Sequence, residues 1–146
     1  MNKKYELTNE TKAWFGHTLH RIRALKDFSN VRAGDLGGWV ESEDNLSQDG
    51  ACWVSDSARV SDSARVGEAG DIFWVGGIGS RNDTTTFFRC ADGKIRVSCG
   101  CFYGDLDEFA AAVKKTHGDN DYAKVYRLAI EMAKVRIGEV RNDDRP

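Results

Sequence analysis

The sequence predicts a mainly β chain that ends in an α+β tail. Three observations carry this prediction: a six-residue repeat in the first half, a β-hairpin signal at Asp92-Gly93, and two helical stripes near the C-terminus. A chain of 146 residues has room for one domain or for two small lobes. Because the pattern changes at Gly70-Asp71, we expect an N-terminal β region over residues 1–70 and an α+β domain over residues 71–146.

The repeat is an identical six-residue unit that occurs twice, at residues 55–60 and 61–66. Small or apolar residues extend its register upstream at a spacing of six: Val40, Leu46, Cys52, Ala58 and Ala64. A second row lies two residues after the last three of these: Val54, Val60 and Val66. Apolar residues at i and i+2 share one face of a strand. A short strand followed by a turn every six residues predicts a β-helix over about residues 36–69.

These residues resemble the hexapeptide-repeat proteins, which form left-handed parallel β-helices; the matching segments are residues 52–54, 58–60 and 64–66. The resemblance implies about two coils here, fewer than the acyltransferases of that family use. The longer pattern resembles a set of small "polymer-forming" proteins encoded by bacteriophages and prophages, through four segments: residues 5–8, 16–19, 21–25 and 34–40. That resemblance implies a phage origin.

The second half predicts a hairpin sheet. A two-residue turn at Asp92-Gly93 would place Arg89 opposite Arg96. The hairpin would then have a core face of Thr86, Phe88, Cys90, Ile95, Val97, Cys99 and Cys101. Its other face would carry Phe87, Arg89, Arg96, Ser98 and Phe102.

Two helices are predicted to cover this sheet. Asp105 and Glu108 have the spacing of a capping box, and Gly118 is placed to end the first helix. Apolar residues at helical spacing from Tyr122 to Ala133 predict the second helix, which Gly138 would close. The tail is therefore expected to be a small sheet packed with two C-terminal helices.

Composition and charge exclude several classes of protein. The net charge is −2, which argues against general nucleic-acid or membrane-surface binding. No apolar run is long enough for a membrane helix. The residues that follow Met1 carry no apolar stretch of the kind found in secretory signals, so we expect a protein of the host bacterial cytosol with reduced thiols.

The principal candidate site binds an anion or a nucleotide. The glycine-rich stretch contributes Gly77, Gly79, Ser80, Arg81 and Asn82, whose backbone N–H groups could cradle phosphate oxygens. A like-charge pair of Arg89 and Arg96 would be relieved by a bound phosphate, and Phe87 and Phe102 could stack on a base. The alternative is that both arginines pair with Asp or Glu residues of the helices or of a neighbouring subunit, or point to solvent.

Metal and catalytic sites are weaker candidates. Cys90, Cys99, Cys101 and His117 could form a structural zinc set, but small buried thiols explain the same pattern, and we expect no metal and no cofactor. All three histidines, His17, His20 and His117, lie outside the repeat, which disfavours acyl transfer. No serine-hydrolase elbow is present.

Self-association is expected because a short β-helix buries little core and exposes strand edges. The resemblance to hexapeptide-repeat proteins implies a trimer as the first form of homo-oligomer, and the large aromatic residues Phe15, Trp39 and Trp53 could form its interface. The resemblance to small phage proteins implies a phage-encoded binding protein that antagonises a host defence system, either by sequestering a nucleotide-derived signal or by blocking a defence protein. A hexapeptide-type transferase, a nucleotide hydrolase and a virion or assembly component remain as alternatives, so catalysis is disfavoured but left open.

Overall fold

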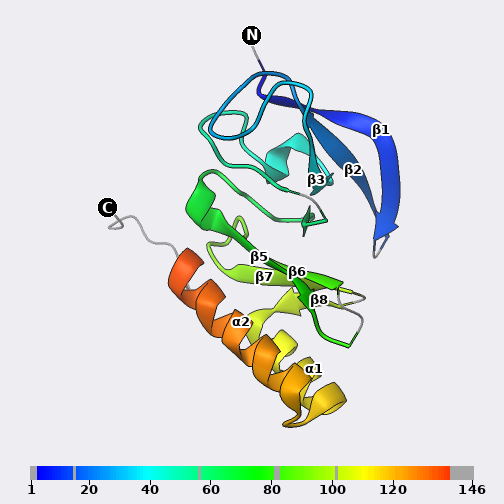
Figure 1. The fold of residues 1–146 in the computed structure, drawn as a ribbon, viewed down its shortest axis with the longest axis vertical. Helices are drawn as coiled ribbons and strands as arrows, with labels where there is room; N and C mark the ends of the chain where they lie inside the picture. The colour runs from blue at the N-terminus through cyan, green and yellow to red at the C-terminus, as the bar shows by residue number, and fades with distance from the viewer. Residues whose placement is uncertain (1–2, 15, 56, 81–82, 101, 139–146) are drawn as a thin grey trace. The chain divides into compact units, whose positions relative to one another are not determined.

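A computed structural model describes residues 3–14, 16–55, 57–80, 83–100 and 102–138 (Figure 1). The chain divides into two compact units, Met1–Ala69 and Gly70–Pro146, and each is described by itself. Each unit contains one four-stranded sheet. Among the described residues, no helix combines the length and the apolar character needed to cross a membrane.

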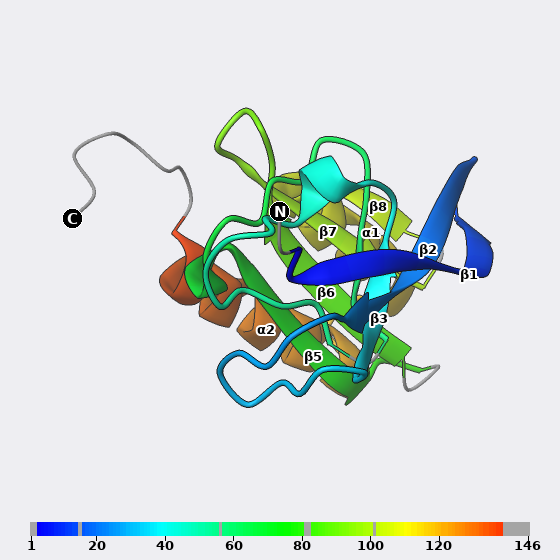
Figure 2. The same ribbon diagram turned by 90° about the horizontal axis from the view of Figure 1, so that it is seen from above.

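The N-terminal unit is built on a sheet with the strand order β1-β2-β3-β4. Strands β1 (Tyr5–Trp14) and β2 (His17–Ala24) form a long antiparallel hairpin, visible as a twisted ribbon in Figure 2. Strand β2 pairs antiparallel with β3 (Leu36–Val40), and β3 pairs parallel with the two-residue strand β4 (Arg59–Val60). A 3₁₀ turn, η1 (Glu43–Asn45), lies between β3 and β4 in the sequence.

The predicted left-handed β-helix of about two coils is wrong. Residues 36–69 contribute β3 and β4 to a mixed four-stranded sheet, and neither sheet of the described chain winds into a helix. Parallel partners such as Val40 and Val60 lie 20 residues apart, whereas coils of three six-residue units would pair residues about 18 apart. In addition, the β1–β2 hairpin pairs with β3 in antiparallel register, through Arg21 and Trp39. The sequence repeat therefore does not continue as a regular coil.

The inward direction of the repeat residues is nevertheless as the alternation predicted. The small and apolar positions of the repeat are buried in the core of the N-terminal unit: Leu46, Cys52, Val54, Ala58, Val60, Ala64 and Val66. Tyr5, Leu19 and Ile22 of the β1–β2 hairpin are buried as well. Burial of apolar surface from both the hairpin and the repeat stabilises this unit.

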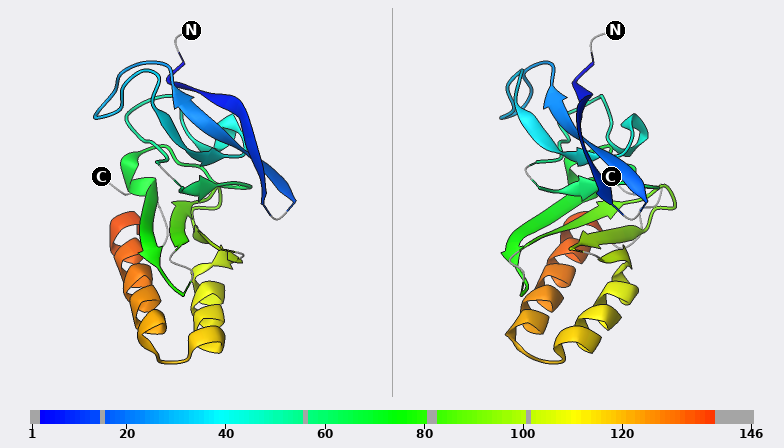
Figure 3. Two further views of the ribbon diagram at one scale, coloured as in Figure 1. Left: turned by 45° about the vertical axis from the view of Figure 1, so that its right-hand side comes forward. Right: turned by 90° about the vertical axis from the view of Figure 1, so that its right-hand side faces the viewer.

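The C-terminal unit is an antiparallel sheet packed with two helices. A 3₁₀ turn, η2 (Ala69–Asp71), leads into a meander with the order β5-β6-β7-β8. The strands are β5 (Ile72–Ile78), β6 (Asp83–Arg89), β7 (Ile95–Cys99) and β8 (Phe102–Asp105). Helices α1 (Leu106–His117) and α2 (Asp121–Ile137) follow and are joined by a short turn (Figure 3).

The predicted helix boundaries are confirmed. The Asp105 carboxylate accepts a hydrogen bond from the Glu108 N–H, and the Glu108 carboxylate accepts one from the Asp105 N–H. Gly118 and Gly138 follow the two helices and donate their N–H groups to Lys114 and Lys134. The core between sheet and helices contains Phe87, Ile95, Val97, Phe109, Val113, Ala123, Tyr126, Ala129, Ile130, Ala133 and Ile137.

The predicted register of the β6–β7 hairpin is wrong by one residue. Arg89 pairs with Ile95, and Phe88 pairs with Arg96. The cause is a three-residue loop, residues 91–93, because the Cys90 N–H donates to the Lys94 carbonyl and the Gly93 N–H donates to the Cys90 carbonyl. A slip of one residue moves side chains of one strand to the opposite face of the sheet. Phe87 therefore shares the helix-packed face with Ile95 and Val97, while Phe88 lies on the other face.

Candidate functional site

A cavity of about 300 Å³ lies in the C-terminal unit beside α1. Its walls come from the β5–β6 and β7–β8 connections, from α1 and from α2. We call it the α1 pocket and define it by its lining residues: Ser80, Asp83, Cys99, Gly100, Phe102, Phe109, Ala112, Val113, Thr116, His117 and Tyr126. This volume is at the lower end of the range of about 300–1,000 Å³ that is typical of small-molecule sites.

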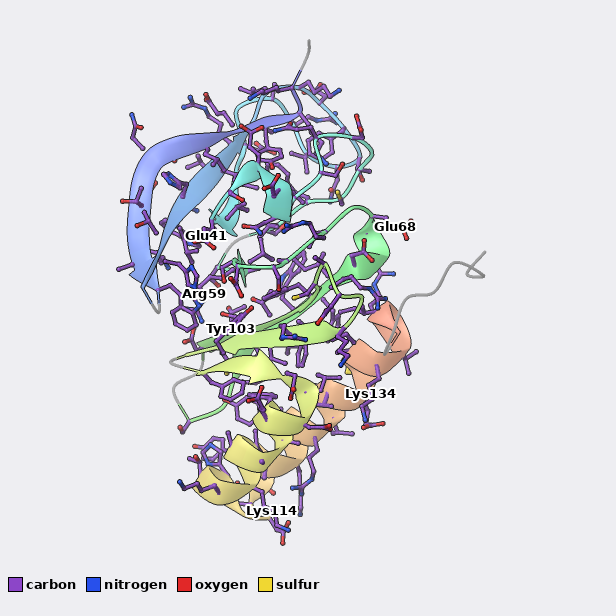
Figure 4. The ribbon with its side chains drawn as sticks, turned by 180° about the vertical axis from the view of Figure 1, so that it is seen from behind. Glu41, Arg59, Glu68, Tyr103, Lys114 and Lys134 are labelled. Carbon is purple, nitrogen blue, oxygen red and sulfur yellow. The ribbon has the colours of Figure 1, made fainter. Side chains whose placement is uncertain are left out.

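Helix α1 forms one wall of the pocket, because its lining side chains recur at helical spacing. Phe109, Val113 and Thr116 recur at intervals of three or four, so they lie on one side of the helix. His117 is the last residue of α1 before Gly118. Lys114, in the same last turn, lies at the end of α1 that is remote from the sheet (Figure 4). The wall of α1 is thus apolar near the sheet and becomes polar toward the C-terminal end of the helix.

The floor of the pocket holds a small polar cluster. Cys99 and Thr85 are cross-strand partners in β7 and β6, and the Thr85 hydroxyl donates to the Cys99 Sγ atom at 3.1 Å. The Cys99 thiol in turn lies 3.8 Å from the Tyr126 hydroxyl. Burial, followed by the nearby Cys99 and Asp83, raises the pKa of Tyr126. The phenol is therefore protonated at neutral pH and can donate a hydrogen bond to a ligand.

Gly79 leaves the space that the Tyr126 hydroxyl occupies. The residue has φ +83°, and a Cβ atom built on it would lie 1.8 Å from Tyr126 Oη. No larger residue fits while Tyr126 keeps its place. Gly79 belongs to the glycine-rich stretch whose backbone N–H groups were predicted to bind an anion. Through its contact with Tyr126, this stretch lies next to the α1 pocket.

Aromatic rings surround the remaining space. The ring centroids of Phe102 and Phe109 are 5.2 Å apart, and those of Phe109 and Tyr126 are 5.5 Å apart at an interplanar angle of 87°. The His117 ring stacks on Tyr126 at 5.9 Å. Edge-to-face and stacked rings of this kind stabilise one another and define flat walls. The pocket therefore has a largely aromatic lining.

Asp83 provides the only carboxylate among the described lining residues. Its Oδ1 atom accepts a hydrogen bond from the Thr84 N–H at 2.8 Å. Its Oδ2 atom lies on the side of Gly100, where a Cβ atom built on that glycine would be 3.8 Å away. The carboxylate can therefore accept hydrogen bonds from a ligand that carries N–H groups, and it disfavours a bound anion.

The structure brings together only part of the predicted anion site. Ser80 and Phe102 line the α1 pocket, and Gly79 lies against Tyr126. Gly77 is an exposed residue of β5. Arg81 and Asn82 lie outside the described residues. Phe87 is buried in the core between sheet and helices and contributes no surface on which a base could stack.

The predicted pair of Arg89 and Arg96 is not formed, because the register differs by one residue. Arg89 is buried: its Nε atom lies 3.6 Å from Asp71 Oδ1, and its guanidinium donates to the carbonyls of Gly93 and Ile137. Arg96 lies on the other face and pairs with Asp92 at 3.0 Å. Both arginines thus pair with acidic residues, but the partners Asp71 and Asp92 lie before β5 and in the hairpin loop, not in the two C-terminal helices as the alternative predicted.

The predicted grouping of the thiols is also wrong. Cys99 shares the face of Phe87, whereas strand alternation places Cys90 with Phe88 on the opposite face. Cys101 lies outside the described residues. Within the described ranges, no group of three or more His, Cys, Asp and Glu residues could hold a metal ion.

The two described residues of the predicted oligomer interface are packed within the N-terminal unit. Trp39 is covered by Lys12, whose Nζ atom lies 4.2 Å from the ring centroid, and by Arg21 at 5.7 Å. Trp53 packs against Tyr5 and Phe28. Phe15 lies outside the described residues. Large apolar side chains that are exposed gather on α2: Tyr122, Val125, Leu128, Met132 and Val135.

The remaining histidines have structural partners. His17 Nδ1 lies 2.6 Å from a Glu41 carboxylate oxygen, and His20 Nδ1 lies 3.0 Å from the Thr8 carbonyl. Figure 4 labels Glu41 on the N-terminal unit. His117, by contrast, lines the α1 pocket. From the sequence, His117 was a candidate for zinc binding and for acyl transfer, and Asp83 and Tyr126 were not among the candidate site residues. No local motif connects residues from four elements.

Comparison with known proteins gives one informative similarity. No protein-family model matches the chain. The chain is 35% identical over 66 residues to a protein of Escherichia coli (strain K12) described as "Uncharacterized acetyltransferase YdcK". The matched region covers 40% of this chain and 20% of that protein. The chain thus spans about a fifth of the length of the curated relative that it matches.

Proposed function

We propose that the chain is a binding protein whose α1 pocket takes a small planar heteroaromatic ligand, such as the base of a nucleotide-derived signalling molecule. The combination that supports this proposal is an aromatic pocket with two hydrogen-bonding groups of opposite character. The Asp83 carboxylate accepts hydrogen bonds, and the protonated Tyr126 hydroxyl donates one. A nucleobase presents both kinds of group on one edge and a flat apolar face.

The pocket favours the base over the phosphate of such a ligand. The described lining residues include neither lysine nor arginine, and the Asp83 carboxylate would repel a phosphate at short range. A cavity of about 300 Å³ has room for a base but little for the charged part of a dinucleotide. The phosphate groups of the ligand would then extend toward solvent.

Isothermal titration calorimetry tests this proposal with a panel of purine and pyrimidine nucleosides, their 5′-monophosphates, cyclic dinucleotides and inorganic phosphate. We expect binding of at least one nucleoside, similar affinity for its monophosphate, and no heat with inorganic phosphate. Asp83→Asn should weaken that binding about tenfold, which is the loss of one charge-assisted hydrogen bond. Binding of phosphate alone, or no binding by any member of the panel, would overturn the proposal.

The cellular role that we propose for this binding is antagonism of a host defence system by a phage-encoded protein. The support is the sequence resemblance to small phage proteins, and the pocket adds a place for the sequestered signal. Blocking of a defence protein, rather than of its signal, is the other form of this role. Expression of a pocket-filled variant in defence-carrying cells separates the two, because only sequestration requires an open α1 pocket.

Acetyl transfer is the second candidate, since the E. coli relative is described as an acetyltransferase. The test is release of free coenzyme A from acetyl-coenzyme A in the presence of amine and hydroxyl acceptors. Turnover that survives filling of the α1 pocket would favour this candidate over binding. The association of copies into a homo-oligomer also remains a proposal, and native mass spectrometry of the full chain measures it directly.

A further inference from the structure

A lysine and a cysteine lie side by side in the buried interior of the N-terminal unit. Lys4 has 0% and Cys52 has 1% of its surface exposed. The Lys4 Nζ atom lies 3.5 Å from the Cys52 Sγ atom. The same nitrogen donates to the Cys52 carbonyl at 2.7 Å and to the Asp49 carbonyl at 3.3 Å, and it lies 5.1 Å from the centre of the Phe28 ring.

The backbone on both sides holds these two atoms together. The N–H groups of Lys4 and Tyr5 both donate to the Gln48 side-chain oxygen, at 2.8 and 3.1 Å. The Tyr5 hydroxyl donates to the Leu46 carbonyl. Segment 46–52 therefore wraps around the start of β1, and the carbonyls that accept from Lys4 Nζ keep the long side chain from turning away. The contact of nitrogen and sulfur is a fixed feature of the unit.

The two groups have matched chemistry. Burial lowers the pKa of Lys4, so a larger fraction of its side chain is the neutral amine, whose lone pair is a nucleophile. A cysteine sulfur that has been oxidised to sulfenic acid is an electrophile and condenses with nitrogen to a sulfenamide. A separation of 3.5 Å is at the upper limit of the range of about 3–3.5 Å from which bonds form.

We propose that Lys4 and Cys52 form an oxidative modification site at which a peroxide links the two side chains by a covalent sulfur–nitrogen bond. In the first step the Cys52 sulfur attacks hydrogen peroxide, the O–O bond breaks, and sulfenic acid and water form. In the second step the Lys4 amine attacks that sulfur, the S–O bond breaks, and the leaving hydroxide takes a proton from nitrogen to form water. The pair loses two hydrogen atoms, and the peroxide supplies the oxidising equivalents.

The bond would join residues that are 48 positions apart in the sequence. A cross-link of this span restricts the unfolded chain and should raise the melting temperature of the N-terminal unit. The C-terminal unit offers an internal comparison, because the groups at the Cys99 sulfur are the hydroxyls of Thr85 and Tyr126, which cannot form a sulfur–nitrogen bond.

Peptide mass spectrometry of the peroxide-treated full chain tests the proposal. After trypsin digestion without reductant, we expect residues 4–12 linked to residues 33–59, with the summed mass of the two peptides less two hydrogens. Dithiothreitol should separate them, and the yield should increase with pH as more Lys4 is neutral. Lys4→Arg, which retains the charge and the donors to the carbonyls, should abolish the linked species. Lys3→Arg, next in the sequence and exposed, should leave it unchanged.

Three outcomes would overturn the proposal. One is Cys52 recovered unmodified at a peroxide dose that oxidises Cys99. A second is Cys52 recovered as sulfinic or sulfonic acid with no linked peptide. The third is a linked pair that persists in Lys4→Arg. Circular dichroism of each untreated variant shows whether it is folded, and if Lys4→Arg does not fold, the identity of the residue linked to Cys52 in the wild-type fragment spectrum decides the question.

Discussion

The side chains of Asp71 and Arg89 form an ion pair in the interior of the C-terminal unit, with 0% and 3% of their surfaces exposed. Asp71 directly precedes β5, and Arg89 is the last residue of β6. The Arg89 guanidinium also donates to the carbonyls of Gly93 and Ile137, so one charged group connects the hairpin loop and the C-terminal end of α2 to the sheet. A cation at that end also complements the helix dipole.

Replacement of Arg89 should therefore be strongly destabilising. Arg89→Met leaves the buried Asp71 carboxylate without this cation, and we expect the free energy of unfolding to fall by about 3–5 kcal/mol. Urea unfolding followed by circular dichroism measures the change. The matched control is Arg96→Met, which removes the more exposed ion pair with Asp92 and should cost about 1 kcal/mol or less. Equal losses for the two variants would contradict the buried position of Arg89.

Gly79→Ala should distort the α1 pocket. The added Cβ atom would lie 1.8 Å from Tyr126 Oη, in a backbone conformation that alanine adopts only with strain. We expect a loss of about 1–3 kcal/mol from the backbone alone and a further loss from the displaced phenol. Gly118→Ala separates the two effects, because Gly118 also has positive φ but has no atom within 4 Å of the added Cβ. If the two variants unfold at the same urea concentration, the contact of Gly79 with Tyr126 is not formed.

The buried phenol of Tyr126 predicts a dependence of stability on alkaline pH. Its pKa is raised in the folded chain above the ordinary value of 10.0, so the folded state binds more protons than the unfolded state above that pH. The free energy of unfolding should then fall as the pH rises above about 10. Urea unfolding at pH 9 and pH 11 should show a smaller fall for Tyr126→Phe than for the wild type. An identical fall would show that the phenol ionises freely in the folded state.

Filling the α1 pocket should abolish ligand binding without unfolding the chain. Ala112 lines the pocket from α1, and Ala112→Trp places an indole in a cavity of about 300 Å³. Ala110 is exposed on the same helix and outside this pocket, so Ala110→Trp is the control for the effect of a tryptophan on α1. Calorimetry with the nucleoside that binds the wild type should give heat for the control only. Binding retained by Ala112→Trp would place the ligand elsewhere.

The helices of the C-terminal unit could be predicted from the sequence because their ends are set by local chemistry. The capping box of Asp105 and Glu108 and the terminal Gly118 act over three or four residues. The same holds for the stripe of α2 that contains Tyr126 and Ala133. In these segments the residues that interact are neighbours in the chain, and the pattern is sufficient.

The hairpin shows where local patterns become insufficient. The sequence correctly placed a turn at Asp92-Gly93, but a three-residue loop in place of a two-residue loop shifted the register by one. That single residue decided whether Arg89 meets Arg96 at the surface or Asp71 in the core. Burial of Phe87 against α1 and α2 favours the observed register, and this energy depends on contacts with residues such as Phe109, 22 positions further along the chain.

The sequence by itself determined which residues are buried along the six-residue repeat, where the two C-terminal helices begin and end, and that a hairpin precedes them. The tertiary structure decided the sheet to which the repeat belongs, the faces of Arg89 and Cys90, and the meeting of Asp83, Cys99, His117 and Tyr126 at one pocket. The physical reason is the distance along the chain between the residues that interact. Propensities, caps and alternation act between neighbouring residues, whereas sheet pairing, burial and the geometry of a pocket depend on contacts between residues far apart in the chain.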